Sequence, residues 1–384
     1  MRVLITTPAG LGHIHPMVPL TRALAARGHD VRWALPEQVA SVVGEQSFDV
    51  IPIAGRDPIT PEEVMRRFPE LADLEPRERP DAMFGKLFGA MATPPMLEGL
   101  ESVALHWRPQ LVVADAADFA GHIVAARLAV PSVTKGFGPL LPEARVRMAA
   151  EEVAPLWRSR GLEPRPYGGA YDYLYLDIYP PEMQVEAGAH VPRRQLMRPT
   201  TEDGAVHGTT LPLPRVRLDL PLVYVTMGTV FNDPEPLIRA LEGVRALDVR
   251  VLVTVGPGVD PGVLGEQPDH VVVASYVPQT ALLPHCDIVV SHGGSGTILG
   301  GLALGIPQVG LPQGADQFLN AEAVAASGAG LSIAPHAASG EAVRDAVAAL
   351  LRDRKYRDAA QRVAASIAAM PPPTDIAEQL EALP

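Results

Sequence analysis

The sequence has a single cysteine, Cys286, which excludes an internal disulfide and a thiolate metal cluster. It contains no apolar run near the roughly 20 residues that a membrane-spanning helix needs. The N-terminus leads into a strand directly after Met1-Arg2, without the apolar core and cleavage site of a secretion signal. These absences favour a cytoplasmic protein that does not enter a membrane.

Positive charge is also scarce. The chain has 32 Lys and Arg against 44 Asp and Glu, a formal net charge of −12, and it has no long basic run. This balance disfavours binding to nucleic acid or to an anionic membrane surface. The 384 residues, 47% of them hydrophobic, are enough for two globular domains.

Short apolar runs alternate with helical patterns in two parts of the chain, before about residue 135 and again after residue 221. This alternation predicts two Rossmann-like doubly wound α/β domains, one over residues 1–205 and one over 222–370. We interpret residues 206–221 as a linker and 371–384 as a C-terminal tail. Ligands of such sheets bind outside the carboxyl ends of the strands, so two facing domains would form a cleft.

Two stretches, 56–100 and 136–185, break the alternation and are rich in Pro, Met, Phe and Tyr. Long apolar excursions of this kind are often binding loops. The alternative is that they only cover the core.

The first strand is followed by "TTPAGLGHIHP", which differs from a dinucleotide-binding loop. Counted from Gly10, the third glycine of G-x-G-x-x-G is replaced by His15, which we assign to packing. We expect His13 to lie in the loop before a helix with Pro16 in its first turn, where the helix dipole disfavours an imidazolium. Asp115 ends the strand 111–115 at the same edge of the sheet, where it could accept the ring N–H and fix the tautomer. Spacing alone leaves Asp118 open as the partner.

The most informative stretch is "DIVVSHGGSGTILGGLALGIP", residues 287–307. A strand, a glycine-rich turn and a helix follow one another, and helix N-termini bind anions. His292, Ser295 and Thr297 add donors, which favours phosphate or diphosphate. The motif has no lysine and is therefore not a Walker loop. The alternative is a tight turn that merely needs glycine.

"SHGGSGT", with "SYVPQTALLPHCD" before it and "LPQGADQFLNA" after it, resembles the nucleotide-sugar glycosyltransferases of the GT-B fold. "GHIHP" and "PLTRALAARGHDV" resemble the N-terminal domain of the same family, in particular of bacterial enzymes that glycosylate macrolides, enediynes and other natural products. The resemblance is strongest over about 220–330 and good over 1–40 and 110–135.

The resemblance implies a binding site for a nucleotide-sugar donor. The donor diphosphate would be held by Thr229, His292, Gly293, Gly294, Ser295, Gly296 and Thr297. The nucleobase and ribose would be bound by Tyr276, Val277, Gln279 and Gly300, and the hexose by Asp316 and Gln317. Two of these residues have other readings from sequence: Tyr276 could pack in the core, and Asp316 could be a helix N-cap.

Gly300 stands where related plant enzymes that use uridine diphosphate sugars have a glutamate that holds the ribose hydroxyls. Glycine offers no acceptor to a ribose 2′-OH, and a buried donor without a partner is costly. We therefore expect a thymidine diphosphate sugar as donor.

The resemblance also implies that His13 is the general base, assisted by Asp115, in an inverting transfer to a hydroxyl of a small apolar aglycone. Candidate residues for the acceptor pocket are Gly12, Met65, Phe84, Phe88, Met91 and Phe137. We expect no cofactor and no metal, because the other histidines, His106, His122, His190, His207 and His336, show no ligand spacing. In similar enzymes the C-terminal tail crosses back to the first domain.

Two other functions are compatible with the fold: a GT-B nucleotide-sugar epimerase, and a catalytically silent partner protein. The apolar stretches 56–100 and 136–185 argue against the epimerase, and the presence of both His13 and Asp115 argues against a silent partner. The sequence alone does not distinguish a monomer from a homodimer or from an enzyme that needs an auxiliary protein.

Overall fold

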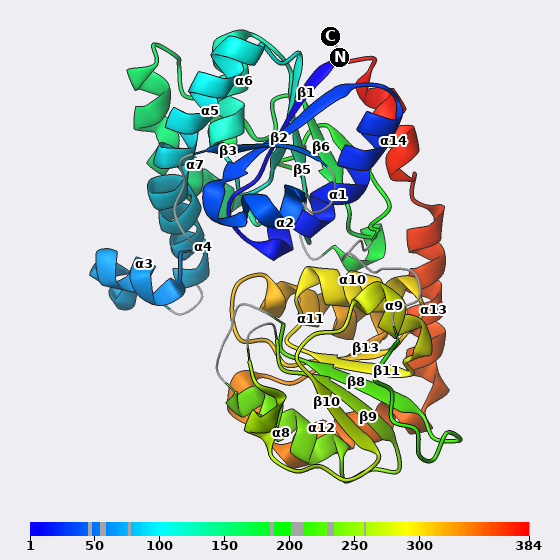
Figure 1. Ribbon diagram of the computed structural model, residues 1–384. Helices are drawn as coiled ribbons and strands as arrows, with labels where there is room; N and C mark the ends of the chain where they lie inside the picture. Colours follow the sequence, from blue (N-terminus) through cyan, green and yellow to red (C-terminus); the bar gives the residue numbers. More distant parts are fainter. Residues whose placement is uncertain are drawn as a thin grey trace. The chain divides into compact units, whose positions relative to one another are not determined.

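The computed structural model describes residues 1–44, 48–53, 59–75, 78–184, 188–200, 210–228, 234–256 and 259–383. The chain forms two compact units, each built on a parallel sheet (Figure 1). One unit consists of Met1–Ile178, Glu186–Met197 and Pro371–Pro384, and the other of Tyr179–Val185 and Arg198–Met370. The two parallel-sheet α/β domains expected from the sequence are therefore present. Thr229 and positions 206–209 of the expected linker lie outside the described residues.

The first unit has a seven-stranded sheet in the order β3-β2-β1-β4-β5-β6-β7, with all neighbours parallel. The central strands β1 and β4 are apolar apart from residues at their ends, because both faces of a parallel sheet are covered by helices. Val3, Leu4 and Ile5 are all fully buried. The strands are β1 (Arg2–Thr6), β2 (Asp30–Pro36), β3 (Asp49–Ile53), β4 (Leu111–Asp115), β5 (Ser132–Lys135), β6 (Leu174–Asp177) and β7 (Arg194–Leu196).

The helices of this unit are α1 (Leu11–Ala26), α2 (Ala40–Gly44), α3 (Pro61–Arg67), α4 (Arg79–Phe84), α5 (Thr93–Trp107), α6 (Ala120–Leu128), α7 (Glu143–Ser159) and α14 (Pro373–Leu380). A stretch of π-helix, Gly85–Ala92, joins α4 to α5. The stretch 56–100 is therefore mostly helical and 136–185 contains α7 and β6, so the expectation of loops was wrong, whereas a binding role for these stretches stays a prediction. Their irregular spacing of apolar residues reflects short, differently wound helices that cover the sheet.

Helix α1 begins at Leu11, earlier than the sequence suggested, so His13 lies in the first turn of the helix and not in a loop before it. The N–H groups of His13 and Ile14 both donate to Gly10 O, at 3.1 Å. Pro16 and Pro19 lie inside the helix. Each proline lacks an N–H and removes one hydrogen bond of the helix, and the burial of Ile14 and Met17 favours the longer helix nonetheless.

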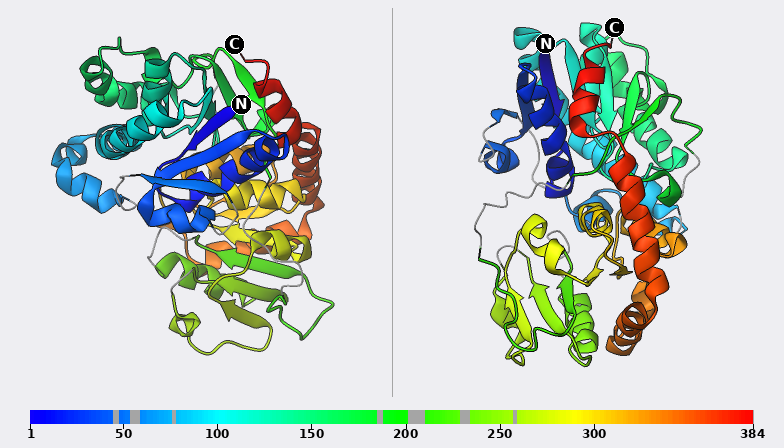
Figure 2. Two further views of the ribbon diagram at one scale, coloured as in Figure 1. Left: turned by 45° about the horizontal axis from the view of Figure 1, so that its top comes forward. Right: turned by 90° about the vertical axis from the view of Figure 1, so that its right-hand side faces the viewer.

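The C-terminal helix α14 packs on α1 within the first unit, as Figure 2 shows. Arg27, just after α1, donates to both carboxylate oxygens of Glu381, at 2.7 and 3.0 Å. Ile376, Ala377 and Leu380 of α14 are buried. The last residues of the chain thus complete the unit with which the chain begins.

The second unit has a six-stranded parallel sheet in the order β10-β9-β8-β11-β12-β13. Its strands are β8 (Leu222–Thr226), β9 (Arg250–Thr254), β10 (Val271–Ala274), β11 (Ile288–Ser291), β12 (Gln308–Gly310) and β13 (Gly330–Ser332). Its helices are α8 (Glu235–Val244), α9 (Gln279–Leu282), α10 (Ser295–Ala303), α11 (Gln317–Ser327), α12 (Gly340–Arg352) and α13 (Arg354–Ala369). In the described part of the chain, no helix combines the length and hydropathy that crossing a membrane requires.

Candidate active site

Both sheets reverse their strand order beside the first strand of the unit. In the first sheet β1 lies between β2 and β4, and in the second β8 lies between β9 and β11. Chains leaving two such neighbouring strands turn in opposite directions, which opens a crevice at their carboxyl ends. In the first sheet, the candidate residue His13 follows β1 and the candidate residue Asp115 ends β4. In the second sheet, Gly228 follows β8 and the candidate residue His292 follows β11.

In the first crevice His13 and Asp115 are hydrogen-bonded, with 2.9 Å between Nδ1 and Oδ1. The Asp115 side chain is 1% exposed and that of His13 is 16% exposed. The same carboxylate oxygen accepts the backbone N–H of Ala117 at 2.9 Å, which fixes its direction. A carboxylate only accepts hydrogen bonds, so the proton lies on Nδ1 and Nε2 is the basic nitrogen of the ring.

The N-terminus of α1 holds the imidazole close to the helix dipole. Gly10, the N-cap, has a φ of 148°, and an added Cβ there would lie 3.3 Å from His13 Cδ2. Glycine is therefore needed for this entry into the helix. The imidazole of His13 thus lies between the positive end of the helix dipole and the Asp115 carboxylate.

Asp118, which the sequence left open as a partner, does not bond His13. Its Oδ1 accepts the N–H groups of Ala120 and Gly121 at the start of α6, at 2.8 and 3.3 Å. Burial raises the pKa of Asp118 to about 6. This side chain serves the helix terminus, and the geometry selects Asp115.

Lys135 is a buried cation beside this pair that the sequence analysis did not single out. It is paired in register with Asp115 on the neighbouring strand, and its Nζ donates to Gly136 O at 2.8 Å. The side chain is 1% exposed, and burial lowers its pKa to about 7, against the opposite effect of Asp115. Asp115 Oδ2 has no hydrogen-bond partner among the described residues. Lys135 interacts with the Asp115 carboxylate through its charge.

Two phenylalanines flank the imidazole edge-to-face. The ring centroid of His13 lies 4.6 Å from that of Phe137 and 5.4 Å from that of Phe88, in the π-helical stretch. Phe84 packs on Phe88 at 4.8 Å. π-Helical turns are frequent at functional sites, and this one places an aromatic ring beside the candidate base.

The other candidates for the acceptor pocket separate into two groups. Gly12 lies next to His13 in the first turn of α1 and is exposed. Met91 is 3% exposed and forms a cluster with Val64 and Leu71, against which Met65 packs. For Met65 and Met91 the structure therefore shows a packing role in this cluster.

In the second crevice the His292 ring is held between two glycines. An added Cβ at Gly228, where φ is 76°, would lie 2.6 Å from His292 Cε1, and one at Gly294 would lie 2.5 Å from Nε2. Burial lowers the pKa of His292 to about 4, so the ring is neutral at pH 7. Its Nδ1 is buried and has no partner among the described residues.

Helix α10 begins at Ser295, and its N-cap Gly294 has no side chain to cap the first N–H groups. These groups carry the positive end of the helix dipole. Gly293, with a φ of 86°, makes the turn, and Gly296 is exposed in the first turn of the helix. The sequence-predicted segment Gly293–Thr297 thus forms a place where an anion can meet backbone N–H groups.

The hydroxyl of Ser295 is already engaged in this structure. It donates to Asp316 Oδ2 at 2.6 Å, so its backbone N–H is what it offers to an anion. Thr297 Oγ1 accepts from Gln279 Nε2 at 3.0 Å and keeps its own proton to donate.

Asp316 occupies the N-cap position of α11 but makes no side-chain cap bond. Its Oδ2 accepts from Ser295 and from Asn320 Nδ2, the latter at 3.0 Å. Gln317 is 4% exposed, and its Oε1 accepts the N–H groups of Gln313 and Gly314. The capping role considered from sequence is thus not the one that Asp316 performs.

Tyr276 is 47% exposed, so the alternative of core packing does not hold for its ring. Val277 next to it is 3% exposed and belongs to the core. Gly300 lies buried inside α10.

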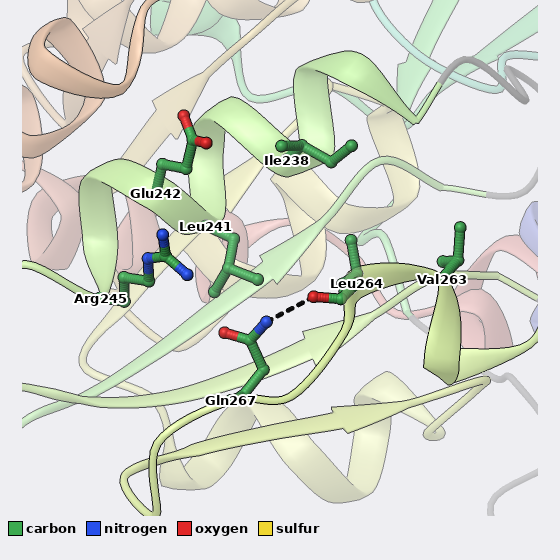
Figure 3. A pocket seen from close by; sticks show the side chains of 7 residues that line it. All are labelled: Ile238, Leu241, Glu242, Arg245, Val263, Leu264 and Gln267. Atoms are coloured by element: carbon green, nitrogen blue, oxygen red, sulfur yellow. Dashed lines mark hydrogen bonds between the residues drawn. The ribbon is translucent and has the colours of Figure 1, made fainter.

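A cavity of about 160 Å³ lies beside α8, and it shares no residue with the sites above (Figure 3). Small-molecule sites are typically about 300–1,000 Å³, so this hollow is too small for a nucleotide sugar. Its lining includes Ile238, Leu241, Arg245, Val263, Leu264 and Gln267. The described residues contain no group of three or more His, Cys, Asp or Glu that could hold a metal ion.

Comparison with known proteins decides the family. Residues 22–197 match the N-terminal domain and residues 238–383 the C-terminal domain described as erythromycin biosynthesis protein CIII-like. L-demethylnoviosyl transferase of Streptomyces niveus is 34% identical over 394 residues, covering 100% of this chain and 98% of the relative. Elloramycin glycosyltransferase ElmGT of Streptomyces olivaceus is 33% identical, covering 99% and 97%. The chain is a glycosyltransferase of the erythromycin biosynthesis protein CIII-like family.

Solved structures agree with this assignment. Spinosyn rhamnosyltransferase SpnG is 29% identical to this glycosyltransferase, with a TM-score of 0.84 and coverage of 100% of both chains. SpnG has also been solved in complex with thymidine diphosphate and with spinosyn aglycone. The glycosyltransferase thus has the GT-B fold expected from its motifs.

Three residues of this glycosyltransferase's sites escaped the sequence analysis: Lys135, Tyr179 and Asn320. Lys135 had a signal, a charge at the end of an apolar strand, and so had Asn320, one helical turn after Asp316. Tyr179 had none, because its partner lies 141 residues away.

The glycines around His292 give a stability prediction. Gly294→Ala forces a methyl group against a ring that Gly228 blocks on the other side, so we expect a loss of roughly 1–3 kcal/mol in the free energy of unfolding, as for overpacked cores. Gly296→Ala is the matched control, since a Cβ there meets nothing within 4 Å. Urea denaturation of both variants measures the difference. Equal free energies of unfolding for the two variants would contradict the tight packing of the His292 ring between Gly228 and Gly294.

Proposed function

We propose that this glycosyltransferase moves a hexose or deoxyhexose from a thymidine diphosphate sugar to a hydroxyl group of a small apolar natural product, with inversion at the anomeric carbon. The hydrogen bond between His13 Nδ1 and Asp115 Oδ1 carries the proposal, because it leaves Nε2 as the base. The complexes of SpnG with thymidine diphosphate and with an aglycone support the two substrate classes.

The proposed reaction begins when His13 Nε2 removes the proton of the acceptor hydroxyl. The oxygen attacks the anomeric carbon from the face opposite the diphosphate, and the bond from that carbon to the diphosphate oxygen breaks. Thymidine diphosphate leaves with the electron pair. Asp115 stabilises the imidazolium that forms, and Phe88 and Phe137 offer the acceptor an apolar surface.

The donor site in this proposal is the glycine-rich turn. The N–H groups at the start of α10 and the ring of His292 donate to the diphosphate, which stabilises its charge as it leaves. Because these groups supply the stabilisation, the proposed reaction requires no metal ion. Tyr276 offers an exposed ring on which the base can stack, and Asp316 and Gln317 bind the hexose.

The first prediction of the proposal concerns His13. His13→Ala should lower kcat by a factor of roughly 10² to 10⁴, the usual contribution of a general base. Asp115→Asn should do less harm, because the amide oxygen can still accept the Nδ1 proton although it carries no charge. Turnover of an aliphatic alcohol acceptor is the measurement, since a phenol ionises more easily without help.

His15→Ala is the control for this experiment, because it removes a neighbouring imidazole from the same helix. Near wild-type kcat in His13→Ala would contradict the assignment.

The second prediction concerns His292. Removal of a hydrogen bond to a charged group costs roughly 1.5–3 kcal/mol, so His292→Ala should weaken thymidine diphosphate binding at least about tenfold. Titration calorimetry measures this, with the exposed His285→Ala as control. Unchanged affinity in His292→Ala would place the diphosphate elsewhere.

The third prediction concerns the donor nucleotide. Gly300 offers no acceptor to a ribose 2′-OH, and a buried donor without a partner costs roughly 1–3 kcal/mol. We expect kcat/KM to be about tenfold higher for the thymidine than for the uridine diphosphate form of the same hexose. Competition between the two donors tests this, and equal use would show that Gly300 does not select the donor.

A further inference from the structure

A buried network beside the donor site converges on Asn320. This side chain, 0% exposed, lies one turn into α11. Its Nδ2 lies 2.8 Å from Gly293 O, 3.0 Å from Ser295 Oγ and 3.0 Å from Asp316 Oδ2. One amide thus touches the glycine-rich turn, the start of α10 and the carboxylate assigned to the hexose.

The partners of Asn320 fix which way its amide faces. Gly293 O and the Asp316 carboxylate only accept hydrogen bonds, so the amide nitrogen must face them. The amide oxygen therefore faces Tyr179, whose hydroxyl lies 2.8 Å away and must donate. Ser295 Oγ lies 3.4 Å from the same oxygen, but its proton is directed to Asp316 at 2.6 Å.

Tyr179 is fully buried and is itself well anchored. It follows β6 along the chain, and its segment, Tyr179–Val185, belongs to the second unit. The turn Pro181–Met183 packs on α11, and Glu182 accepts from Ser366 Oγ of α13 at 2.9 Å. These contacts hold the segment in place, so the Tyr179 hydroxyl stays within hydrogen-bond distance of Asn320.

Asp316 is thereby held through one oxygen only. Its Oδ2 accepts from Ser295 and Asn320, whereas Oδ1 accepts from no residue in the part of the chain that the structure describes. Asp316 is half-buried, so Oδ1 can accept a hydrogen bond from a bound hydroxyl. The direction of Oδ1 depends on the position of Oδ2.

We infer that Tyr179 is a positioning residue for the donor sugar: through Asn320 it aims the free oxygen of Asp316 at a hexose hydroxyl. The inference rests on the proposed role of Asp316 in hexose binding. Without the tyrosine hydroxyl, the buried amide oxygen of Asn320 loses its donor, and the amide must leave its place or remain unsatisfied. When the amide moves, Asp316 Oδ2 loses its Nδ2 donor and Gly293 O loses the same donor, whereas the backbone N–H groups at the start of α10 remain in place.

The test compares thymidine diphosphate with thymidine diphosphate glucose, each titrated calorimetrically into the full-length enzyme. Tyr179→Phe should weaken binding of the sugar nucleotide about five- to twentyfold and leave the diphosphate within about twofold, because a buried acceptor that loses its donor is costly. Tyr356→Phe is the control, a tyrosine of α13 in the second unit that packs on the core of the sheet and touches none of these residues. It should change neither affinity.

Asp316→Asn, together with the double variant that carries both Asp316→Asn and Tyr179→Phe, completes a double-mutant cycle. If Tyr179 acts through Asp316, adding Tyr179→Phe to Asp316→Asn should lower the affinity for the sugar nucleotide by less than about a further twofold. The reason is that the effects of substitutions within one hydrogen-bond network are not additive. Full additivity would overturn the inference. So would an equal loss of affinity for both ligands in Tyr179→Phe, which would mean a general structural role.

The outcomes separate this inference from the proposed function. If Asp316→Asn leaves binding of the sugar nucleotide unchanged, the hexose role of Asp316 fails and the inference fails with it. If Asp316→Asn weakens binding and Tyr179→Phe does not, only the positioning role is lost. Should Tyr179→Phe not fold, Ser295→Ala releases the same Oδ2 and should show the same loss confined to the sugar nucleotide.

Discussion

The hydrogen bond between His13 and Asp115 is the contact on which the proposed chemistry of this glycosyltransferase depends, and several features of the first unit hold it in place. It requires β1 and β4 to be neighbours, Asp115 to be the last residue of its strand, and α1 to begin early enough for His13 to lie in its first turn. The Ala117 N–H fixes the carboxylate, and Gly10 permits the turn into the helix. Burying the charged carboxylate of Asp115 removes it from water, which is unfavourable. Its hydrogen bonds to His13 and to the Ala117 N–H, and the charge of Lys135, offset this loss of solvation.

In the proposed function, the second unit uses the same topology to bind the donor diphosphate. The strand order of the second sheet reverses between β8 and β11. The turns after these strands contain Gly228, Gly293 and Gly294, and no side chain caps the N-terminus of α10. The imidazole of His292 is neutral and wedged, so the donors are in place before any anion binds. Such preorganised dipoles stabilise developing charge without reorganising during the reaction. The Asn320 network then links this turn to Asp316.

Much of the fold followed from the sequence, because apolar runs and glycine-rich turns are local signals. β4 lies where it was predicted, and so does the turn that leads into α10. The start of α1 was missed because Pro16 was taken as a residue of the first turn, whereas the helix begins at Leu11 and buries Ile14 and Met17. Lys135 and Tyr179 were missed because their roles come from contacts that only folding creates. Asp115 could be preferred over Asp118 from family resemblance, but only the geometry excluded the second carboxylate.

The tautomer of His13 tests the central claim most directly. With selectively 15N-labelled histidine and a His13 variant to assign its signals, NMR can tell which ring nitrogen carries the proton when the imidazole is neutral. The account predicts a protonated Nδ1 and an unprotonated Nε2, a preference that Asp115→Asn should weaken. A proton found on Nε2 in the unaltered enzyme would contradict it, because that ring could not accept a proton from the acceptor hydroxyl.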